Sequence, residues 1–176
     1  MPGERILILG CSGAGKSTLA RRIGERTGFP VTHLDALFWQ PGWIEDHPEF
    51  DARAIAAASA DSWIIEGGYT GRPSFALRAT RADTVILLDF DRWRCLARVL
   101  WRAVQWRGRS RPDMAQGCPE KVDLPFLAFI WNWRRISRPK VFSRLAAFGR
   151  SPQVLRTPGE VAAFLARFDT ARPPRA

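Results

Sequence analysis

Residues Gly10 to Ser17 read G-x-x-x-x-G-K-S and follow directly on the apolar run at residues 6–9. Glycine at positions 10, 13 and 15 lets the backbone curl so that several N–H groups point at phosphate oxygens. The lysine of such a motif contacts the β- and γ-phosphates, and its serine offers a hydroxyl to Mg²⁺. The sequence therefore predicts a strand, a loop that binds ATP with Mg²⁺, and a helix whose N-terminus faces the phosphates. The residues expected to bind the nucleotide are Gly10, Cys11, Ser12, Gly13, Ala14, Gly15, Lys16, Ser17 and Thr18.

The rest of the chain alternates short apolar runs with amphipathic stretches. Further strands are expected at residues 31–34, 63–65, 85–88 and 153–155, with helices between them. Such alternation predicts a parallel sheet covered on both faces, with ligands bound at the carboxyl ends of the strands. We expect a three-layer α/β/α P-loop NTPase fold with a five-stranded parallel sheet, formed as a single domain over residues 1–176.

The net charge of +10 is concentrated in one segment. Residues 92–150 carry fourteen of the Lys and Arg residues, only three of the Asp and Glu residues, and five of the eight tryptophans. Such a segment suits nucleic acid, an anionic membrane or the phosphates of a nucleotide. No apolar run approaches the roughly 20 residues of a membrane-spanning helix. The first strand begins close to Met1, and the three cysteines are scattered, so we expect a cytoplasmic protein with no signal peptide or membrane partner.

A long helix is expected after Asp91, with an apolar face at Trp93, Leu100 and Val104 and arginines on the opposite side. Residues 106–123 then lack periodicity, and loops of that length are usually functional. Within this excursion Arg107, Arg109 and Arg111 alternate along the chain. They belong either to a solvated basic loop or to a lid that closes over nucleotide phosphates, and we favour the lid. The next helix, residues 126–148, is expected to be interrupted at Pro139.

Acidic residues follow three of the predicted strands, namely Asp35, Glu66 and Asp89. The carboxyl ends of parallel strands meet at one edge of a sheet, so these residues are expected near the phosphate loop. Asp89 is the nearest match to a Walker B acid and, with Ser17, is a candidate metal ligand; the similarity of Glu66 to an acid of nucleotide kinases makes it a third candidate. The absence of a Glu after Asp89 favours a transferase over a motor ATPase. His33 is expected to face away from Asp35 and to be a packing residue.

The segments HLDALFWQPGW, WIIEGGYTGR, ADTVILLDF and RPDMAQGCPE follow the phosphate loop in this order. With it they resemble the DNA topology modulation proteins, which belong to the adenylate-kinase-like branch of the P-loop kinases, over nearly the whole chain. The resemblance implies a core sheet of five parallel strands, a helical part that binds the substrate and a mobile lid. Because the family's name describes a genetic effect, the resemblance implies the fold more strongly than the function.

Phosphoryl transfer to a hydroxyl needs a group that accepts the hydroxyl proton. By analogy with nucleoside-type kinases Asp35 is the candidate base and acceptor ligand; its alternatives are a water-mediated magnesium ligand or a helix cap. By similarity to nucleotide kinases Glu66 holds metal or substrate. Arg72 and Arg78 are candidate clamps for an acceptor phosphate, although Arg72 matches the kinase pattern only loosely. Trp39 is expected either to stack on the acceptor ring or to pack at the rim of the site.

The expected function is an ATP- and Mg²⁺-dependent kinase of a small hydroxyl- or phosphate-bearing acceptor, similar to a nucleoside or nucleotide. Lys16, Asp35, Arg107 and Arg111 are the expected catalytic residues, and Arg109 is expected on the nucleotide. The alternatives are a nucleotide-dependent DNA-binding regulator and a polynucleotide 5′-hydroxyl kinase. Because no nucleic-acid-binding motif accompanies the basic segment, the small-molecule kinase is preferred.

Overall fold

The computed structural model describes residues 3–45 and 47–169 of the chain. The strands are β1 (Arg5–Gly10), β2 (Val31–His33), β3 (Trp39–Gln40), β4 (Ile44–Glu45), β5 (Trp63–Glu66), β6 (Thr84–Leu88) and β7 (Gln153–Leu155). The helices are α1 (Lys16–Thr27), α2 (Leu34–Phe38), α3 (His47–Ser59), α4 (Ser74–Arg81), α5 (Arg92–Gln105), α6 (Leu124–Ala146) and α7 (Pro158–Asp169).

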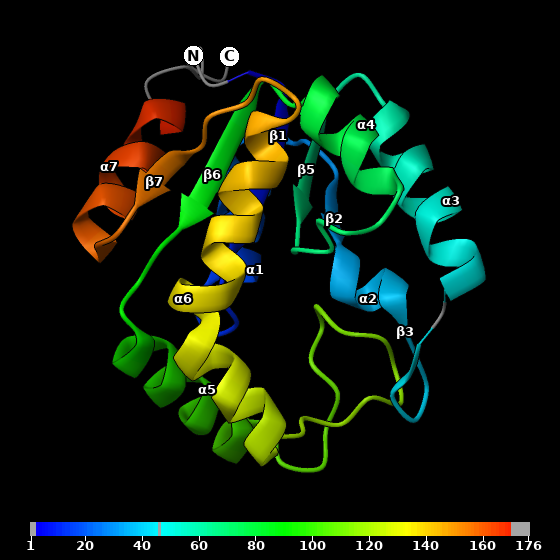
Figure 1. The fold of residues 1–176 in the computed structure, drawn as a ribbon, viewed down its shortest axis with the longest axis vertical. Helices are drawn as coiled ribbons and strands as arrows, with labels where there is room; N and C mark the ends of the chain where they lie inside the picture. The colour runs from blue at the N-terminus through cyan, green and yellow to red at the C-terminus, as the bar shows by residue number, and fades with distance from the viewer. Residues whose placement is uncertain (1–2, 46, 170–176) are drawn as a thin grey trace, which may run out of the picture.

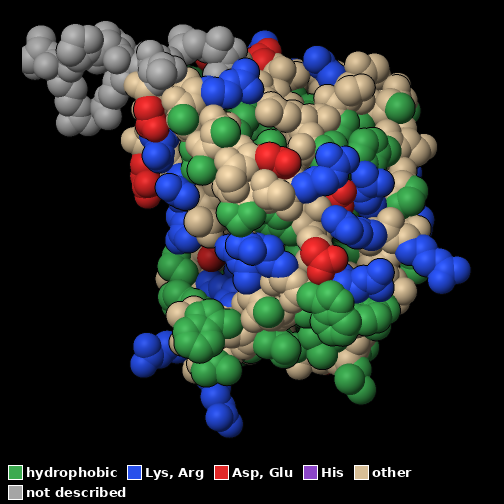
Figure 2. All heavy atoms as spheres, turned by 90° about the vertical axis from the view of Figure 1, so that its left-hand side faces the viewer, with side chains coloured by type: hydrophobic (Ala, Val, Ile, Leu, Met, Phe, Trp, Pro, Cys, Tyr) green, Lys and Arg blue, Asp and Glu red, His purple; other side chains and the backbone are tan. Residues whose placement is uncertain are grey.

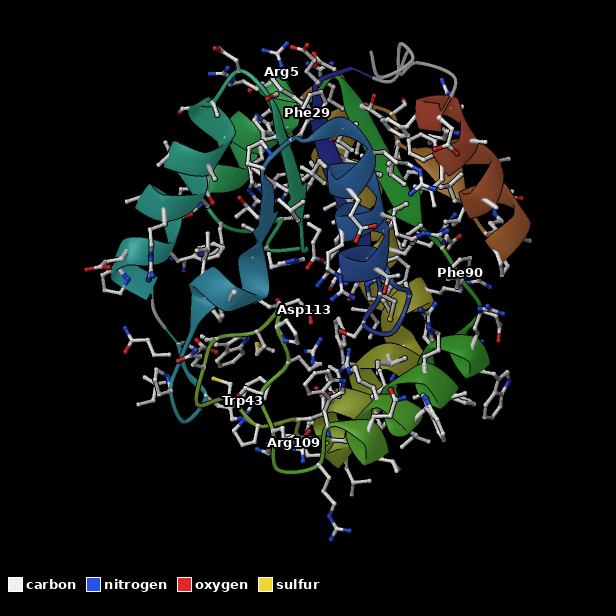
Figure 3. All side chains as sticks on the ribbon, turned by 180° about the vertical axis from the view of Figure 1, so that it is seen from behind. Arg5, Phe29, Trp43, Phe90, Arg109 and Asp113 are labelled. Carbon is white, nitrogen blue, oxygen red and sulfur yellow. The ribbon has the colours of Figure 1, made fainter. Side chains whose placement is uncertain are left out.

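Five parallel strands form the main sheet in the order β2-β5-β1-β6-β7. The central strand β1 carries four apolar residues, 6–9, that are completely buried, as expected of a strand covered on both faces. Helices α1 and α7 pack together on one face of the sheet, and α4 and α6 lie on the other (Figures 1 and 3). The predicted three-layer α/β/α P-loop NTPase fold is confirmed.

The carboxyl ends of the strands face α2, α5 and the excursion at residues 106–123 (Figure 1). The excursion has no helix or strand and is attached to the hairpin formed by β3 and β4. Gly42 N donates a hydrogen bond to Gly117 O (2.9 Å), Trp43 Nε1 donates to Pro119 O (3.1 Å), and Cys118 Sγ donates to Gln40 O (3.1 Å). The excursion therefore lies across the edge of the sheet where ligands bind in this fold.

The predicted orientation of α5 is wrong. Its buried residues are Cys95 and Val99, whereas Trp93, Trp101 and Val104 are 65–71% exposed. Figure 2 shows hydrophobic side chains on the surface at the lower end of the molecule, beside side chains of Lys or Arg. Helix α5 lies beside the phosphate loop rather than on the sheet. The buried side of α5 is the one that carries smaller residues, Cys95 and Val99. The arginine side of α5 consequently reaches the phosphate loop.

Two other sequence-based boundaries differ from the structure. β2 ends at His33, and Asp35 lies in the first turn of the short helix α2 rather than directly at the end of a strand. The aromatic residues that follow form the β3–β4 hairpin. Helix α6 continues through Pro139 without interruption. Within residues 3–45 and 47–169, no helix combines the length and apolarity needed to cross a membrane.

The phosphate loop packs closely against α5 at Gly13. A Cβ atom at this position would lie 2.3 Å from Cys95 O, and the φ angle of Gly13 is +78°. Both observations exclude a side chain, because a Cβ would clash with backbone and left-handed φ values strain residues other than glycine. Gly108, in the excursion, also has a positive φ of +70°, but a Cβ atom there would meet no atom within 4 Å beyond its chain neighbours.

These two glycines allow a matched test of the close approach. We expect Gly13→Ala to lower the free energy of unfolding by about 3 kcal/mol, from backbone strain of about 1–2 kcal/mol together with overpacking. Gly108→Ala should show only the strain, about 1–2 kcal/mol. Urea denaturation of both variants measures the difference, and equal midpoints would contradict the steric argument.

Candidate active site

The phosphate loop has the geometry that its sequence predicts. Gly15, with φ of +96°, precedes the first residue of α1, and Lys16 Nζ donates a hydrogen bond to Cys11 O at 3.2 Å. A cavity of about 450 Å³, here called the phosphate-loop cavity, opens at this helix N-terminus. Of the predicted nucleotide-binding residues, those that line it are Gly13, Gly15, Lys16, Ser17 and Thr18. Cys11 and Ala14 are buried.

The hydroxyl of Ser17 is joined to a polar network at the end of β5. Ser17 Oγ donates to Glu66 Oε1 at 3.0 Å, and His33 Nδ1 lies 2.8 Å from the same oxygen. The expectation that His33 is a packing residue is therefore wrong. Strand alternation placed it on the wrong side because β2 ends at His33, where the chain turns into α2. Glu66 is 2% exposed and receives its partners from two other elements.

Asp113 completes the polar surroundings of Ser17 from the excursion. It is buried and lines the phosphate-loop cavity. Figure 3 places it at the inner tip of the excursion, beside the start of α1, with Arg109 at the outer edge. Burial alone would raise the pKa of Asp113, but the positive charge of Arg111 and the neighbouring Ser17 hydroxyl outweigh burial and lower this pKa. This carboxylate was counted in the sequence but not recognised as a site residue.

Asp35, in the first turn of α2, lines a different cavity together with Ser12 of the phosphate loop. Tyr69 Oη donates a hydrogen bond to Asp35 Oδ1 at 2.7 Å. Burial is the largest influence on Asp35 and raises its pKa, and the charge of Glu66 acts in the same direction. Lys16 and the Tyr69 hydroxyl oppose this shift but do not cancel it. A carboxylate with a raised pKa is better matched to accept a proton near neutral pH than an ordinary surface aspartate.

A second cavity, of about 360 Å³, is lined by Asp35 and is here called the Asp35 cavity. Trp39 and Trp43 line it from the β3–β4 hairpin, with ring centroids 5.3 Å apart. Phe126, from the first turn of α6, lines it as well. Trp39 thus lines the same cavity as Asp35, and its contact with an acceptor stays a prediction.

Arg111 and Arg102 line both cavities. Arg111 pairs with Asp113 (2.9 Å) and with Glu120 (2.6 Å), and Arg102 pairs with Glu120 at 2.7 Å. Of the three alternating arginines of the excursion, the structure thus brings only Arg111 to the site. The side chains of Arg107 and Arg109 are exposed and line neither cavity.

The predicted clamps for an acceptor phosphate are engaged elsewhere. Arg78 is completely buried, donates to Gly68 O (3.3 Å) and Tyr69 O (3.1 Å), and has its pKa lowered to about 10 by burial. Arg72 pairs with Asp51 at 2.8 Å. Neither arginine lines the two cavities. Arg78 instead holds the turn that carries Tyr69, the hydrogen-bond partner of Asp35.

Asp89 is surrounded by arginines. Its two carboxylate oxygens lie 3.3 Å from Arg134 Nε and 3.0 Å from Arg138 Nε, and it is 3% exposed. These ion pairs compensate the burial of the carboxylate and occupy the oxygens that a metal would need. The arrangement argues against Asp89 as a magnesium ligand. Asp89 can be buried because it pairs with arginines of α6.

Several site residues were not found from the sequence, namely Tyr69, Arg98, Arg102, Asp113 and Glu120. Tyr69 could have been considered from the sequence, because it lies only three residues after Glu66, which was itself a predicted site residue. Asp113 and Glu120 were counted among the three acidic residues of the basic segment, and their rarity there was a usable signal for a role at the site. Arg98, whose guanidinium donates to Ala14 O at 3.4 Å, is one of the arginines expected opposite the apolar face of α5, and it was missed because the buried side of α5 was predicted wrongly.

Comparison with solved structures finds this fold in small-molecule kinases. A shikimate kinase from Acinetobacter baumannii, in complex with shikimate, matches with a TM-score of 0.61 and 16% identity over 96% of this chain and 92% of that chain. A shikimate kinase from Bacteroides thetaiotaomicron matches with a TM-score of 0.55 and 18% identity, over 95% and 97%. A sugar kinase from Janibacter sp. HTCC2649 matches with a TM-score of 0.51 and 20% identity, over 97% and 96%.

At these identities the likeness establishes the fold, a P-loop NTPase fold of the kind found in these kinases. No protein-family model matches the chain, and no curated protein matches it. The resemblance to the DNA topology modulation proteins is not shown by these comparisons and stays a prediction.

The buried Arg78 provides a test of how the Tyr69 turn is held. We expect Arg78→Met to lower the free energy of unfolding by about 2 kcal/mol, because two partly buried carbonyl groups lose their donors. Arg144→Met, at an exposed position of the same residue type on α6, should change it by less than about 0.5 kcal/mol. Chemical denaturation measures both, and a loss of the same size in the two variants would contradict the role given to Arg78.

Proposed function

We propose that this protein is a kinase that transfers the γ-phosphoryl group of ATP to a hydroxyl group of a small acceptor similar to a nucleoside or nucleotide. The observation that supports it best is the pair of cavities that meet at Arg102 and Arg111. One cavity opens at the phosphate loop, and the other carries a carboxylate suited to accept a proton. Two substrates bound in these cavities would meet at the two arginines.

In the proposed reaction a bond forms between the acceptor oxygen and the γ-phosphorus, and the bond between that phosphorus and the β–γ bridging oxygen breaks. ADP leaves, and the acceptor proton passes to Asp35. The loop amides and Lys16 bind the phosphates, and Arg111 stabilises negative charge that develops during transfer. Arg98, which lies over the loop, adds a further positive charge on the nucleotide side.

Magnesium would be held mainly through Ser17 and Glu66. Within the described residues there is no group of three or more His, Cys, Asp and Glu side chains that could hold a metal ion. Such a group is not required, because Mg²⁺ commonly uses one or two protein ligands together with waters and substrate phosphates. Ser17 Oγ and Glu66 Oε1, 3.0 Å apart and beside the cavity, fit that sparse set. When bound, the ion would neutralise phosphate charge.

A nucleic-acid ligand is not needed to account for the basic segment. Arg102, Arg111, Arg134 and Arg138 form ion pairs within the chain, and Arg92 lies over the Trp131 ring at 4.7 Å. These contacts favour the small-molecule kinase over a DNA-binding regulator or a polynucleotide kinase.

The three cysteines, none of them in a disulfide, are in keeping with the proposed location in the cytoplasm.

The direct test of the proposal is ADP release from ATP with Mg²⁺, measured alone and with a panel of nucleosides, nucleotides, sugars and short oligonucleotides. Stimulation by a small acceptor, with phosphoryl transfer verified by product analysis, is the expected outcome. ATP binding without stimulation by any compound would contradict the proposal, and stimulation by oligonucleotides alone would favour the nucleic-acid alternatives.

Replacement of the proposed base provides a sharper test. We expect Asp35→Asn to reduce the rate of phosphoryl transfer at least about 100-fold, because the amide cannot accept the acceptor proton. Binding of a fluorescent ATP analogue should be nearly unchanged. Asp61→Asn, at an exposed position, makes the same chemical change outside both cavities and should keep normal turnover. Unchanged turnover of the Asp35 variant would end its assignment as the base.

The pH dependence of the reaction tests the pairing of Asp35 with Tyr69. Asp35 must be ionised to act as a base, so kcat/KM is expected to fall as the pH drops through its raised pKa. The Tyr69 hydrogen bond lowers that pKa, and Tyr69→Phe removes it. The acidic limb of the pH profile should therefore move to higher pH in the variant. A limb that stays in place or moves to lower pH would contradict the pairing.

A further inference from the structure

The Asp35 cavity has aromatic walls. Trp39 and Trp43 stand with their rings inclined by 70°, and Phe126 and the buried Met114 add further apolar surface. The hydrogen bond from Trp43 Nε1 to Pro119 O ties the hairpin to the excursion. Planar rings pack well on such surfaces, by stacking and by edge contacts. The cavity volume of about 360 Å³ falls within the range of small-molecule sites.

The charged residues of this cavity balance one another. Its lining includes three cations, Arg102, Arg111 and Lys121, and three acids, Asp35, Glu120 and Asp123. The side chain of Glu120 is 3% exposed, and its two oxygens lie 2.7 Å from Arg102 and 2.6 Å from Arg111. At the rim, Lys121 pairs with Asp123 at 3.3 Å. Each cation of the lining thus has a carboxylate partner within the protein.

The cations expected to bind an acceptor phosphate are also engaged. Arg78 is buried among backbone carbonyls, and Arg72 pairs with Asp51. A phosphate or carboxylate entering the Asp35 cavity would have to displace Glu120 from its arginines, which would leave a buried carboxylate without its partners. It would also approach Asp35, a like charge. An uncharged ligand meets neither obstacle.

From these observations we infer that the acceptor is an uncharged, hydroxylated compound with a planar ring, a nucleoside, and that the ion pairs of Glu120 exclude acceptors bearing a phosphate or carboxylate. This inference rests on the proposed function and refines its acceptor. The ring lies against Trp39, Trp43 and Phe126, and one hydroxyl faces Asp35. That hydroxyl forms the new bond to the γ-phosphorus and gives its proton to Asp35, while ADP leaves.

The test compares acceptors that share one reactive hydroxyl. A nucleoside and its 3′-monophosphate both offer a free 5′-hydroxyl, and only the second carries an added anion. Free ribose offers hydroxyls without the planar ring. We expect kcat/KM for the nucleoside to exceed that for the 3′-monophosphate, and that for ribose, at least tenfold each, measured with purine and pyrimidine compounds.

The outcomes separate this inference from the proposed function. If the 3′-monophosphate, a 5′-monophosphate or gluconate is phosphorylated as well as the nucleoside or better, the kinase proposal stands and the neutral-acceptor inference is overturned. If ribose matches the nucleoside, the role of the aromatic walls is overturned. If ATP binds but no compound of the panel is phosphorylated, the proposed function itself fails.

Glu120→Gln tests the cause of the selection. The amide keeps the shape of the side chain but removes the charge that neutralises Arg102 and Arg111. We expect the ratio of kcat/KM for the 3′-monophosphate to that for the nucleoside to rise at least tenfold. Glu49→Gln, at an exposed position of α3, makes the same chemical change outside the cavity and should leave the ratio unchanged. A thermal melt verifies folding, and a folded Glu120 variant with the wild-type ratio would overturn the inference.

Discussion

The central strand β1 is hydrogen-bonded along both edges, to β5 and to β6, and its apolar residues are completely buried. The parallel register sets Ile8 opposite Glu66 and Gly10 opposite Leu88. The phosphate loop, which leaves the end of β1, is therefore fixed beside the residues that leave β5 and β6. The contact between Ser17, in the first turn of α1, and Glu66, the last residue of β5, is made at the edge where these paired strands end. Burial of the sheet thus stabilises the fold and sets the spacing of the site.

The arginine-rich segment is organised by its few carboxylates. Glu120 pairs with two arginines, Asp113 pairs with Arg111, and Asp89, outside the segment, pairs with two arginines of α6. Buried charges are costly unless they are paired and hydrogen-bonded, so these contacts determine which arginines turn inward. The inward arginines of the excursion and α5 lie between the two cavities, and the exposed side chains of Arg107 and Arg109 stay at the surface.

The position of Asp35 depends on residues that bind no substrate in the proposed reaction. Tyr69 has a positive φ of +48°, which is uncommon for a residue with a side chain and stores strain of about 1–3 kcal/mol. Arg78 holds this turn by donating to two successive carbonyls within it, Gly68 O and Tyr69 O. Held in this position, the turn directs the Tyr69 hydroxyl to Asp35, to which the hydroxyl donates a hydrogen bond. A buried arginine that lines neither cavity therefore positions the proposed base.

The amino-acid sequence alone determined the phosphate loop, the alternation of strands and helices, and the extent of the excursion. These features rest on local spacing and backbone preference, which a sequence displays directly. Only the tertiary structure decided which side of α5 is buried, that Arg111 rather than Arg107 or Arg109 reaches the site, and that Arg78 is structural. The reason is physical. Periodicity identifies an apolar face but not the surface that covers it, and the ion pairs and hydrogen bonds that orient Arg102, Arg134 and Asp35 join residues from different parts of the chain.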